Sequence, residues 1–271
     1  MRGHRVSRWG ALTISIWLGA TAAWAQTVTP QAPFEPKVGQ AGKDVVWVPT
    51  PQALVNKMLD MAKVTPQDYL IDLGSGDGIT VITAAKRGVT ALGIEYNPDM
   101  VELATRNAAE AKVTDKATFV KADIFESDFS KATVITMFLL PQLNLKLRPT
   151  ILNLKPGTRI VSNSFTMDDW QPDETANVTD GCTSWCTALF WLVPAKVDGA
   201  WRLGNDDLTL TQQFQKISGS LGGTPITDAA LKGADIAFTV GTAKYTGRVT
   251  ANGMEGTVTG GASAKWSATR R

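Results

Sequence analysis

The chain has 271 residues, a formal net charge of +2 and a single histidine, His4. The near-neutral charge argues against a nucleic-acid partner. A lone imidazole argues against a histidine-based catalytic triad or metal centre, so we expect no metal.

The first 25 residues have the layout of a secretory signal peptide. Three arginines precede the apolar run Ala11–Ala23, and residues 23–25 read A-x-A, a signal-peptidase cleavage pattern. Cleavage would remove these arginines and the histidine and change the net charge from +2 to −1. The pattern predicts an exported, periplasmic protein. The alternative is an uncleaved anchor formed by residues 1–25, which is the only membrane contact that we expect.

The residues that follow predict a linker and then a helix. Residues 26–44 are rich in proline, glutamine and glycine, which favours a linker. Residues 45–51 read V-V-W-V-P-T-P, where Thr50 can cap a helix and Pro51 suits its first turn. Apolar residues recur at helical spacing from Leu54 to Ala62 and would face a core. By itself this segment could be no more than a helix start.

A glycine-rich turn is the most informative stretch. Residues 69–78, Y-L-I-D-L-G-S-G-D-G, predict a buried strand, a tight turn and then a helix over 79–87. The spacing G-x-G-x-G differs from the G-x-G-x-x-G of dinucleotide-binding turns. Asp72 would repel a phosphate but suits a cation. We therefore expect a positively charged, phosphate-free nucleoside ligand, contacted by Asp72, Gly74, Ser75, Gly76, Asp77 and Gly78.

The next predicted strand, residues 91–95, ends on an acid, Glu95. An acid at this strand tip, about twenty residues after the glycine turn, can accept hydrogen bonds from both hydroxyls of a ribose. A solvated surface acid is the alternative. Asn97 and Pro98 predict the cap and the first position of another helix.

The remaining pattern predicts a two-part chain. Further strands are expected at 117–121, 133–140, 160–165, 187–193 and 201–203, with a helix over 143–154 and a hairpin turn at 196–199. We expect an α/β fold over residues 45–203: a Rossmann-like, seven-stranded, mostly parallel sheet flanked by helices. Residues 204–271 alternate apolar and polar residues between glycines, which predicts a small antiparallel β region to which we assign no chemistry.

Both cysteines, Cys182 and Cys186, lie in one short segment. In a reducing compartment they would be two buried thiols, whereas after export they would form a local disulfide. The C-x-x-x-C spacing is a weak metal signal, because no histidine can complete the site. We favour the disulfide.

The D-L-G-S-G-D-G turn resembles the first motif of the class I S-adenosylmethionine-dependent methyltransferases. The V-P-T-P segment before it and the leucine-leucine-proline turn at 139–141 resemble the family that includes the mitochondrial ATP synthase c-subunit lysine methyltransferase. The resemblance covers residues 45–203 and implies S-adenosylmethionine as the cofactor. It implies that Asp72 holds the methionyl or sulfonium end, Glu95 the ribose, and Asp123 and Ile124 the adenine.

The resemblance also implies N-methylation of a protein lysine by in-line transfer. A neutral, desolvated amine suffices for this reaction, so we assign no general base. The chain lacks the N-P-P-Y tetrapeptide of many amino-methylating relatives, which argues against an adenine or glutamine acceptor. A small-molecule or lipid methyltransferase stays open, as does a non-catalytic module that binds S-adenosylmethionine or a nucleoside, and a dehydrogenase is the weakest alternative. The substrate-side candidates implied by the family are Pro49, Thr50, Pro51, Leu140 and Pro141.

Overall fold

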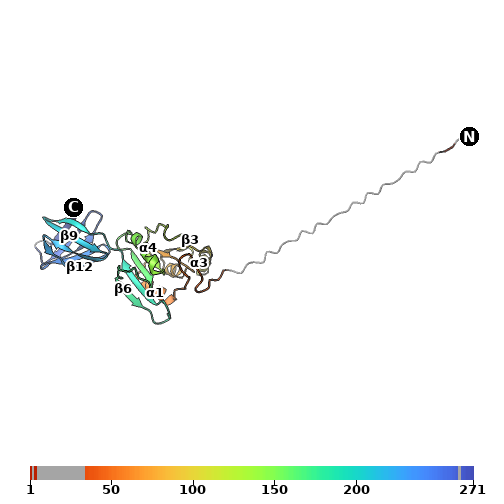
Figure 1. The fold of residues 1–271 in the computed structure, drawn as a ribbon, viewed down its shortest axis with the longest axis horizontal. Helices are drawn as coiled ribbons and strands as arrows, with labels where there is room; N and C mark the ends of the chain where they lie inside the picture. The colour runs from red at the N-terminus through yellow and green to blue at the C-terminus, as the bar shows by residue number, and fades with distance from the viewer. Residues whose placement is uncertain (2, 5–33, 262–263) are drawn as a thin grey trace. The chain divides into compact units, whose positions relative to one another are not determined.

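The computed structural model describes residues 1, 3–4, 34–261 and 264–271. Residues Phe34–Arg271 form one compact unit (Figure 1). The predicted signal peptide lies almost entirely outside the described residues, as do residues 26–33 of the predicted linker. None of the helices in the described residues combines the length and the apolar character that a membrane span needs.

The described residues form two sheets, and the first has the strand order β3-β2-β1-β4-β5-β7-β6. The neighbouring strands β3, β2, β1, β4 and β5 all run parallel. In contrast, β7 is antiparallel to β5, and β6 is antiparallel to β7. The predicted Rossmann-like fold with seven strands is confirmed, but the sheet is mixed rather than mostly parallel. In chain order its elements are α1 (Gln52–Met61), β1 (Tyr69–Leu73), α2 (Ile79–Lys86), β2 (Thr90–Glu95), α3 (Pro98–Glu110), β3 (Ala117–Lys121), β4 (Val134–Met137), α4 (Pro141–Ile151), β5 (Arg159–Asn163), β6 (Glu174–Asn177) and β7 (Thr187–Leu192).

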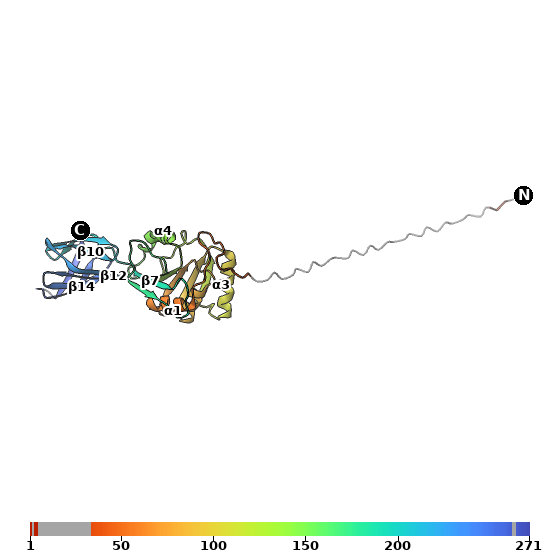
Figure 2. The same ribbon diagram turned by 60° about the horizontal axis from the view of Figure 1, so that its bottom comes forward.

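Both faces of this sheet are covered by helices. Side chains alternate along a strand, so Leu70 of β1 packs in the core that includes α1 and α2, whereas Ile71 packs in the core that includes α4. The same alternation holds in β4 for Val134 and Ile135. Figure 2 shows α1 and α4 on opposite sides of the sheet. Burial on both faces explains why these strands read as continuous apolar runs.

The predicted seventh strand, Trp201–Leu203, is wrong as a member of this sheet. It belongs to β8 (Gly199–Leu203), which pairs with β9 and β16 of the second sheet. The seventh strand is instead β6, whose four residues are exposed or half-buried at an edge. An edge strand with polar side chains carries no apolar alternation, so the sequence pattern missed it. The boundary between the two sheets therefore falls after β7 and before Gly199, not at 203.

The second sheet contains nine strands of the described residues, all antiparallel, and is larger than the small region expected from the sequence. Strands β10 and β12 lie next to each other, so the sheet nearly closes into a barrel. Phe238, Tyr245 and Trp266 pack together in its core, with centroids 4.8–6.0 Å apart. Its elements are β8, β9 (Asp206–Gln213), β10 (Lys216–Leu221), β11 (Thr224–Pro225), β12 (Thr227–Lys232), β13 (Asp235–Val240), β14 (Ala243–Val249), β15 (Met254–Thr259) and β16 (Lys265–Arg270).

The helix starts agree with the sequence in one case and differ in another. The Asn97 side chain accepts a hydrogen bond from the Asp99 amide at 2.9 Å and caps α3, which is confirmed. Thr50 does not cap α1, because the residue at the N-cap is Pro51. The Thr50 hydroxyl instead accepts a hydrogen bond from Asn163 Nδ2 at 3.4 Å.

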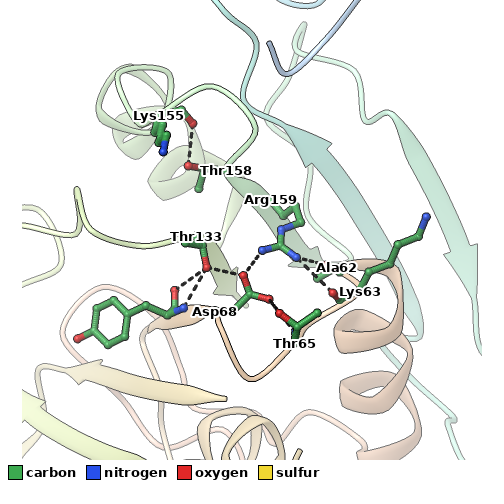
Figure 3. Close-up of polar contacts among 9 residues, drawn as sticks. Ala62, Lys63, Thr65, Asp68, Thr133, Lys155, Thr158 and Arg159 are labelled. Carbon is green, nitrogen blue, oxygen red and sulfur yellow. Dashed lines mark hydrogen bonds and ion pairs between the residues drawn. The ribbon is translucent and has the colours of Figure 1, made fainter. Parts of the chain in front are cut away.

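A polar network joins the amino ends of β1, β4 and β5 (Figure 3). Asp68, just before β1, is ion-paired with Arg159 and accepts a hydrogen bond from the Thr133 hydroxyl at 2.8 Å. Arg159 also donates to the Ala62 carbonyl at 2.8 Å. Asp68 is only 8% exposed, so its charge depends on these partners. The network therefore holds the strands together at their amino ends, whereas the predicted site residues lie at the carboxyl ends.

Candidate active site

A cavity of about 220 Å³ lies at the carboxyl ends of β1, β2, β3 and β4. Strand order reverses between β1 and β4, and ligands of open α/β sheets bind in the crevice outside such a switch point. The cavity collects residues from the turns after these four strands and from residues 40–50. Most of the predicted site residues line it: Pro49, Thr50, Asp72, Gly74, Ser75, Gly76, Asp77, Glu95, Asp123, Ile124 and Leu140.

The glycine turn exposes backbone to this cavity. Gly76 has a φ of +53°, and a Cβ on it would lie 2.9 Å from Trp47 Nε1, so both conformation and space require glycine. Gly78 is not among the lining residues. A Cβ there would lie 2.7 Å from Phe119, so the third glycine serves packing under α2. The Ser75 hydroxyl lies against β2, 2.5 Å from where a Cβ of Gly93 would stand.

Glu95 links the first two strand ends. Its carboxylate accepts hydrogen bonds from the Gly76 amide at 3.0 Å and from the Asn97 amide at 2.9 Å. One oxygen therefore holds the glycine turn and the other holds the start of α3. Glu95 is half-buried and lines the cavity, where its remaining lone pairs are available to the hydroxyl groups of a ligand.

Asp72 is the most deeply buried acid of the cavity. It is 6% exposed, and Thr136 donates a hydrogen bond to it at 2.6 Å across the β1–β4 pair. Burial raises the pKa of Asp72 to about 7, and the nearby charges of Asp77 and Glu95 act in the same direction against the Thr136 hydrogen bond. Burial likewise raises the pKa of Asp77, although the Ile79 amide opposes it. A cation in the cavity would relieve this crowding of acids.

Residues 40–47, which we call the strap, pass over the end of the cavity near β2 and β3. The Trp47 amide donates to the Gln40 carbonyl at 2.9 Å, and Ala41 and Val46 form a bridge. The linker prediction is therefore wrong for residues 40–44, because they fold back on themselves and line the cavity. Because residues 40–44 are small or polar, the sequence pattern did not indicate that they line a cavity.

The strap is attached to Asp123, which the resemblance assigned to adenine. Lys43 forms an ion pair with Asp123 Oδ2, and the Phe125 amide donates to Oδ1 at 2.9 Å. The hydrogen bond from Lys43 lowers the pKa of Asp123 below its ordinary value. Lys43 also lies 4.6 Å from the ring centroid of Tyr96. In this structure both oxygens of Asp123 thus serve the protein itself.

The substrate-side candidates separate into two groups. Pro49, Thr50 and Leu140 line the cavity. Pro141 starts α4 and Pro51 precedes α1; Pro51 and Pro141 are absent from the lining.

The sequence reasoning missed the aromatic part of the cavity. Phe138, Phe165 and Trp185 all line it, as do Trp47 and Tyr96. Phe138 directly follows β4 and Phe165 lies two residues after β5, at the strand ends where the site was predicted, so their position was a usable signal. Trp185 lies between Cys182 and Cys186, whose predicted disulfide the structure contains. No local pattern indicated that this loop reaches the cavity.

The cavity fits a cationic ligand without phosphate. Among its lining residues the only basic side chain is Lys43, which is already paired, whereas the acids are Asp44, Asp72, Asp77, Glu95 and Asp123. Together with the fold, this donor set defines a class I S-adenosylmethionine-dependent methyltransferase. Residues 72–174 match the family described as the ANTKMT methyltransferase domain. The chain belongs to this methyltransferase family, as two relatives that match it over more than two thirds of their own length show.

Individual relatives agree with the family. A protein-lysine N-methyltransferase of Saccharolobus islandicus (strain REY15A) is 46% identical over 140 residues, which cover 51% of this chain and 87% of the relative. The human lysine N-methyltransferase of the ATP synthase c-subunit is 31% identical over 169 residues, covering 62% and 70%. A Salinibacter ruber structure described as an RNA methyltransferase in complex with S-adenosyl-L-homocysteine is 45% identical, has a TM-score of 0.52, and covers 55% of this chain and 96% of that one.

We expect Glu95→Gln to weaken S-adenosylmethionine binding about 10- to 100-fold, the equivalent of roughly 1.5–3 kcal/mol for a charge-assisted hydrogen bond. The amide has one acceptor oxygen, so either the Gly76 or the Asn97 amide loses its partner. Titration calorimetry with S-adenosylmethionine measures the change, and NAD serves as a ligand that should not bind. Glu102→Gln, which removes a 74% exposed acid on α3, is the matched control. Equal affinity in both variants would contradict the role of Glu95.

Proposed function

We propose that this methyltransferase transfers a methyl group from S-adenosylmethionine to the side-chain amine of a protein lysine. One observation carries the proposal: a single cavity has acids at the glycine turn and the end of β2 and aromatic rings at the ends of β4 and β5. The acids suit the cationic donor, and the rings suit an alkyl amine. The names of the Saccharolobus and human relatives support lysine as the acceptor.

Methyl transfer requires the protein to position the donor and the acceptor and to exclude water from the acceptor amine. When bound, S-adenosylmethionine supplies an electrophilic methyl carbon on a sulfonium sulfur. Asp72 and Asp77 would hold its charged end, Glu95 its ribose, and the strap with Ile124 its adenine. Phe138, Phe165 and Leu140 exclude water from the acceptor side. A desolvated lysine has a lowered pKa, so it loses its proton to solvent before it attacks, and no lining histidine is needed.

The test is methyl transfer to a mixed acceptor pool. The purified full chain is incubated with methyl-labelled S-adenosylmethionine and an extract that contains protein, RNA and lipid, and the labelled products are identified by mass spectrometry. We expect the label on lysine Nε atoms of protein. Label in RNA only would favour the activity described for the Salinibacter ruber structure. Label in lipid or small molecules would favour the alternative acceptors, and no label at all would favour a binding module.

We further propose that the protein is exported and that residues 1–25 are its signal peptide. The Cys182–Cys186 disulfide supports this, because disulfides persist in oxidising compartments. We expect the protein in the periplasmic fraction to begin at Gln26, which mass spectrometry of its N-terminal peptide measures. An intact Met1 in the membrane fraction would instead support the anchor.

A further inference from the structure

Three aromatic side chains form a continuous surface in the cavity, which we call the aromatic wall. The ring centroids of Phe138 and Phe165 are 5.9 Å apart and the rings stack at 21°. Trp185 lies 5.1 Å from Phe165 and 6.1 Å from Phe138, tilted against both. All three residues line the cavity that holds the predicted cofactor contacts.

The protein holds the wall in place from several sides. The carbonyl of Phe165 accepts hydrogen bonds from the Ser162 hydroxyl at 2.8 Å and from Asn144 Nδ2 at 3.2 Å, and Asn144 is fully buried. Phe138 directly follows β4. The backbone at Phe165 is therefore held by β5 and α4, and Phe138 is held by its place at the end of β4.

Trp185 is held differently. It lies in the loop between β6 and β7, inside the ring closed by the Cys182–Cys186 disulfide. Its φ is +56°, a conformation that bulky side chains rarely adopt. Its side chain is also 45% exposed, and exposure of so large an apolar surface to water is unfavourable. A strained, exposed tryptophan that reaches a cavity indicates a function for this loop rather than core packing.

We propose that the aromatic wall binds the acceptor side chain in its alkylammonium form, before the lysine loses its proton and after it is methylated, and that the disulfide positions Trp185 for this contact. The inference rests on the proposed lysine acceptor and names its subsite. Aromatic faces attract ammonium groups, and most of all methylated ones, which shed water easily. The cavity's own cation, Lys43, lies over Tyr96 and not over the wall. The wall should therefore bind more tightly as methyl groups are added to the lysine nitrogen.

The first experiment measures binding to the full chain saturated with S-adenosyl-L-homocysteine. The probes are Nα-acetyl-lysine amides with no, one, two or three Nε-methyl groups, and a neutral isostere in which carbon replaces the trimethylated nitrogen. We expect affinity to rise along the methylated series and to exceed that of the isostere. Trp185→Ala should weaken trimethyl-lysine binding about tenfold, which corresponds to about 1.4 kcal/mol. Trp185→Phe should stay within about threefold of wild type, because a ring face remains.

The controls separate this role from general damage. Affinity for S-adenosyl-L-homocysteine should be unchanged in both Trp185 variants. Val120→Ala, which trims an exposed apolar side chain outside the cavity lining, should bind every probe like wild type. Equal weakening of the charged probe and its isostere would overturn the proposal, because it would mark apolar packing alone. Unchanged probe binding in Trp185→Ala would also overturn it.

The disulfide is tested in the same assay. The Cys182→Ser variant, or wild type treated with a dithiol that reduces the bridge to two thiols and itself becomes oxidised, should lose trimethyl-lysine affinity in the same direction as Trp185→Ala. Full retention would overturn the positioning role. In turnover, Trp185→Ala should raise KM for a lysine peptide but not for S-adenosylmethionine. Wild type that methylates no lysine would refute the proposed function, whereas methylation with normal KM in Trp185→Ala would refute only the subsite.

Discussion

Asp68→Asn is expected to lower the free energy of unfolding by about 3 kcal/mol at pH 7, as breaking a buried ion pair does. The substitution keeps the shape of the side chain but leaves Arg159 without its countercharge between the carbonyls of Ala62 and Lys63. The amide oxygen can still accept a hydrogen bond, but the charged contact between the start of β1 and β5 would be lost. Chemical denaturation of the full chain, followed by circular dichroism, measures the change.

The matched control for Asp68 is Asp60→Asn. Asp60 pairs with Arg87 at 2.6 Å but is 63% exposed, so removing its charge should shift the denaturation midpoint far less. Burial alone would raise the pKa of Asp68, but hydrogen bonds from Arg159, Thr133 and the Thr65 amide lower it below 3.8. A lowered pKa stabilises the fold above the ordinary value and loses this effect as the pH falls through the folded-state value. The difference between Asp68→Asn and wild type should therefore shrink below about pH 4, and a constant difference would contradict this account.

S-adenosylmethionine affinity is expected to rise with pH up to about 7 and then level off, because Asp72 titrates there in the free protein. The cationic ligand favours the ionised carboxylate, so binding below this pH must release a proton from Asp72. For a single group of this pKa, affinity should fall about tenfold from pH 8 to pH 6. Calorimetry in buffers of different ionisation enthalpy would detect the released proton.

Asp72→Asn should bind more weakly and show a flatter pH profile. The amide can still accept from Thr136 but carries no charge for the ligand. Asp99→Asn, which changes an exposed acid at the start of α3, should keep the wild-type profile and so corrects for titration of the ligand itself. A pH dependence that survives in Asp72→Asn would assign it to another group.

Ionised Asp72 should also lower the free energy of unfolding of the protein without cofactor. A carboxyl whose pKa is raised in the folded protein favours folding while protonated, and this is lost as the pH rises from 3.8 toward 7. Without cofactor, Asp72→Asn should therefore be more stable than wild type at pH 8. Asp68 and Asp72 lie four residues apart yet have opposite pKa shifts. Asp68 has a buried countercharge within the protein, Arg159. For Asp72, we expect the cationic ligand to supply the countercharge.

The parts of the site that lie within one short segment could be predicted from the sequence. The strand-turn-helix at 69–87, the acid at the end of β2 and the Asn97 cap follow from backbone sterics and hydrogen bonding among neighbours. The alternation and apolar content of the strands were also enough for the fold class, because a sheet covered on both faces needs such runs.

Contacts between distant segments required the tertiary structure. The pairing of Lys43 with Asp123, the strap, and the meeting of Phe138, Phe165 and Trp185 each join residues that share no local pattern. The assignment of Trp201–Leu203 to the second sheet is of the same kind. The sequence by itself determined most of the strands and helices of the first sheet, although not β6, and which acids stand at the strand ends. Only the tertiary structure decided which distant side chains enclose those acids, because an apolar or aromatic residue specifies that it must be covered but not by which segment.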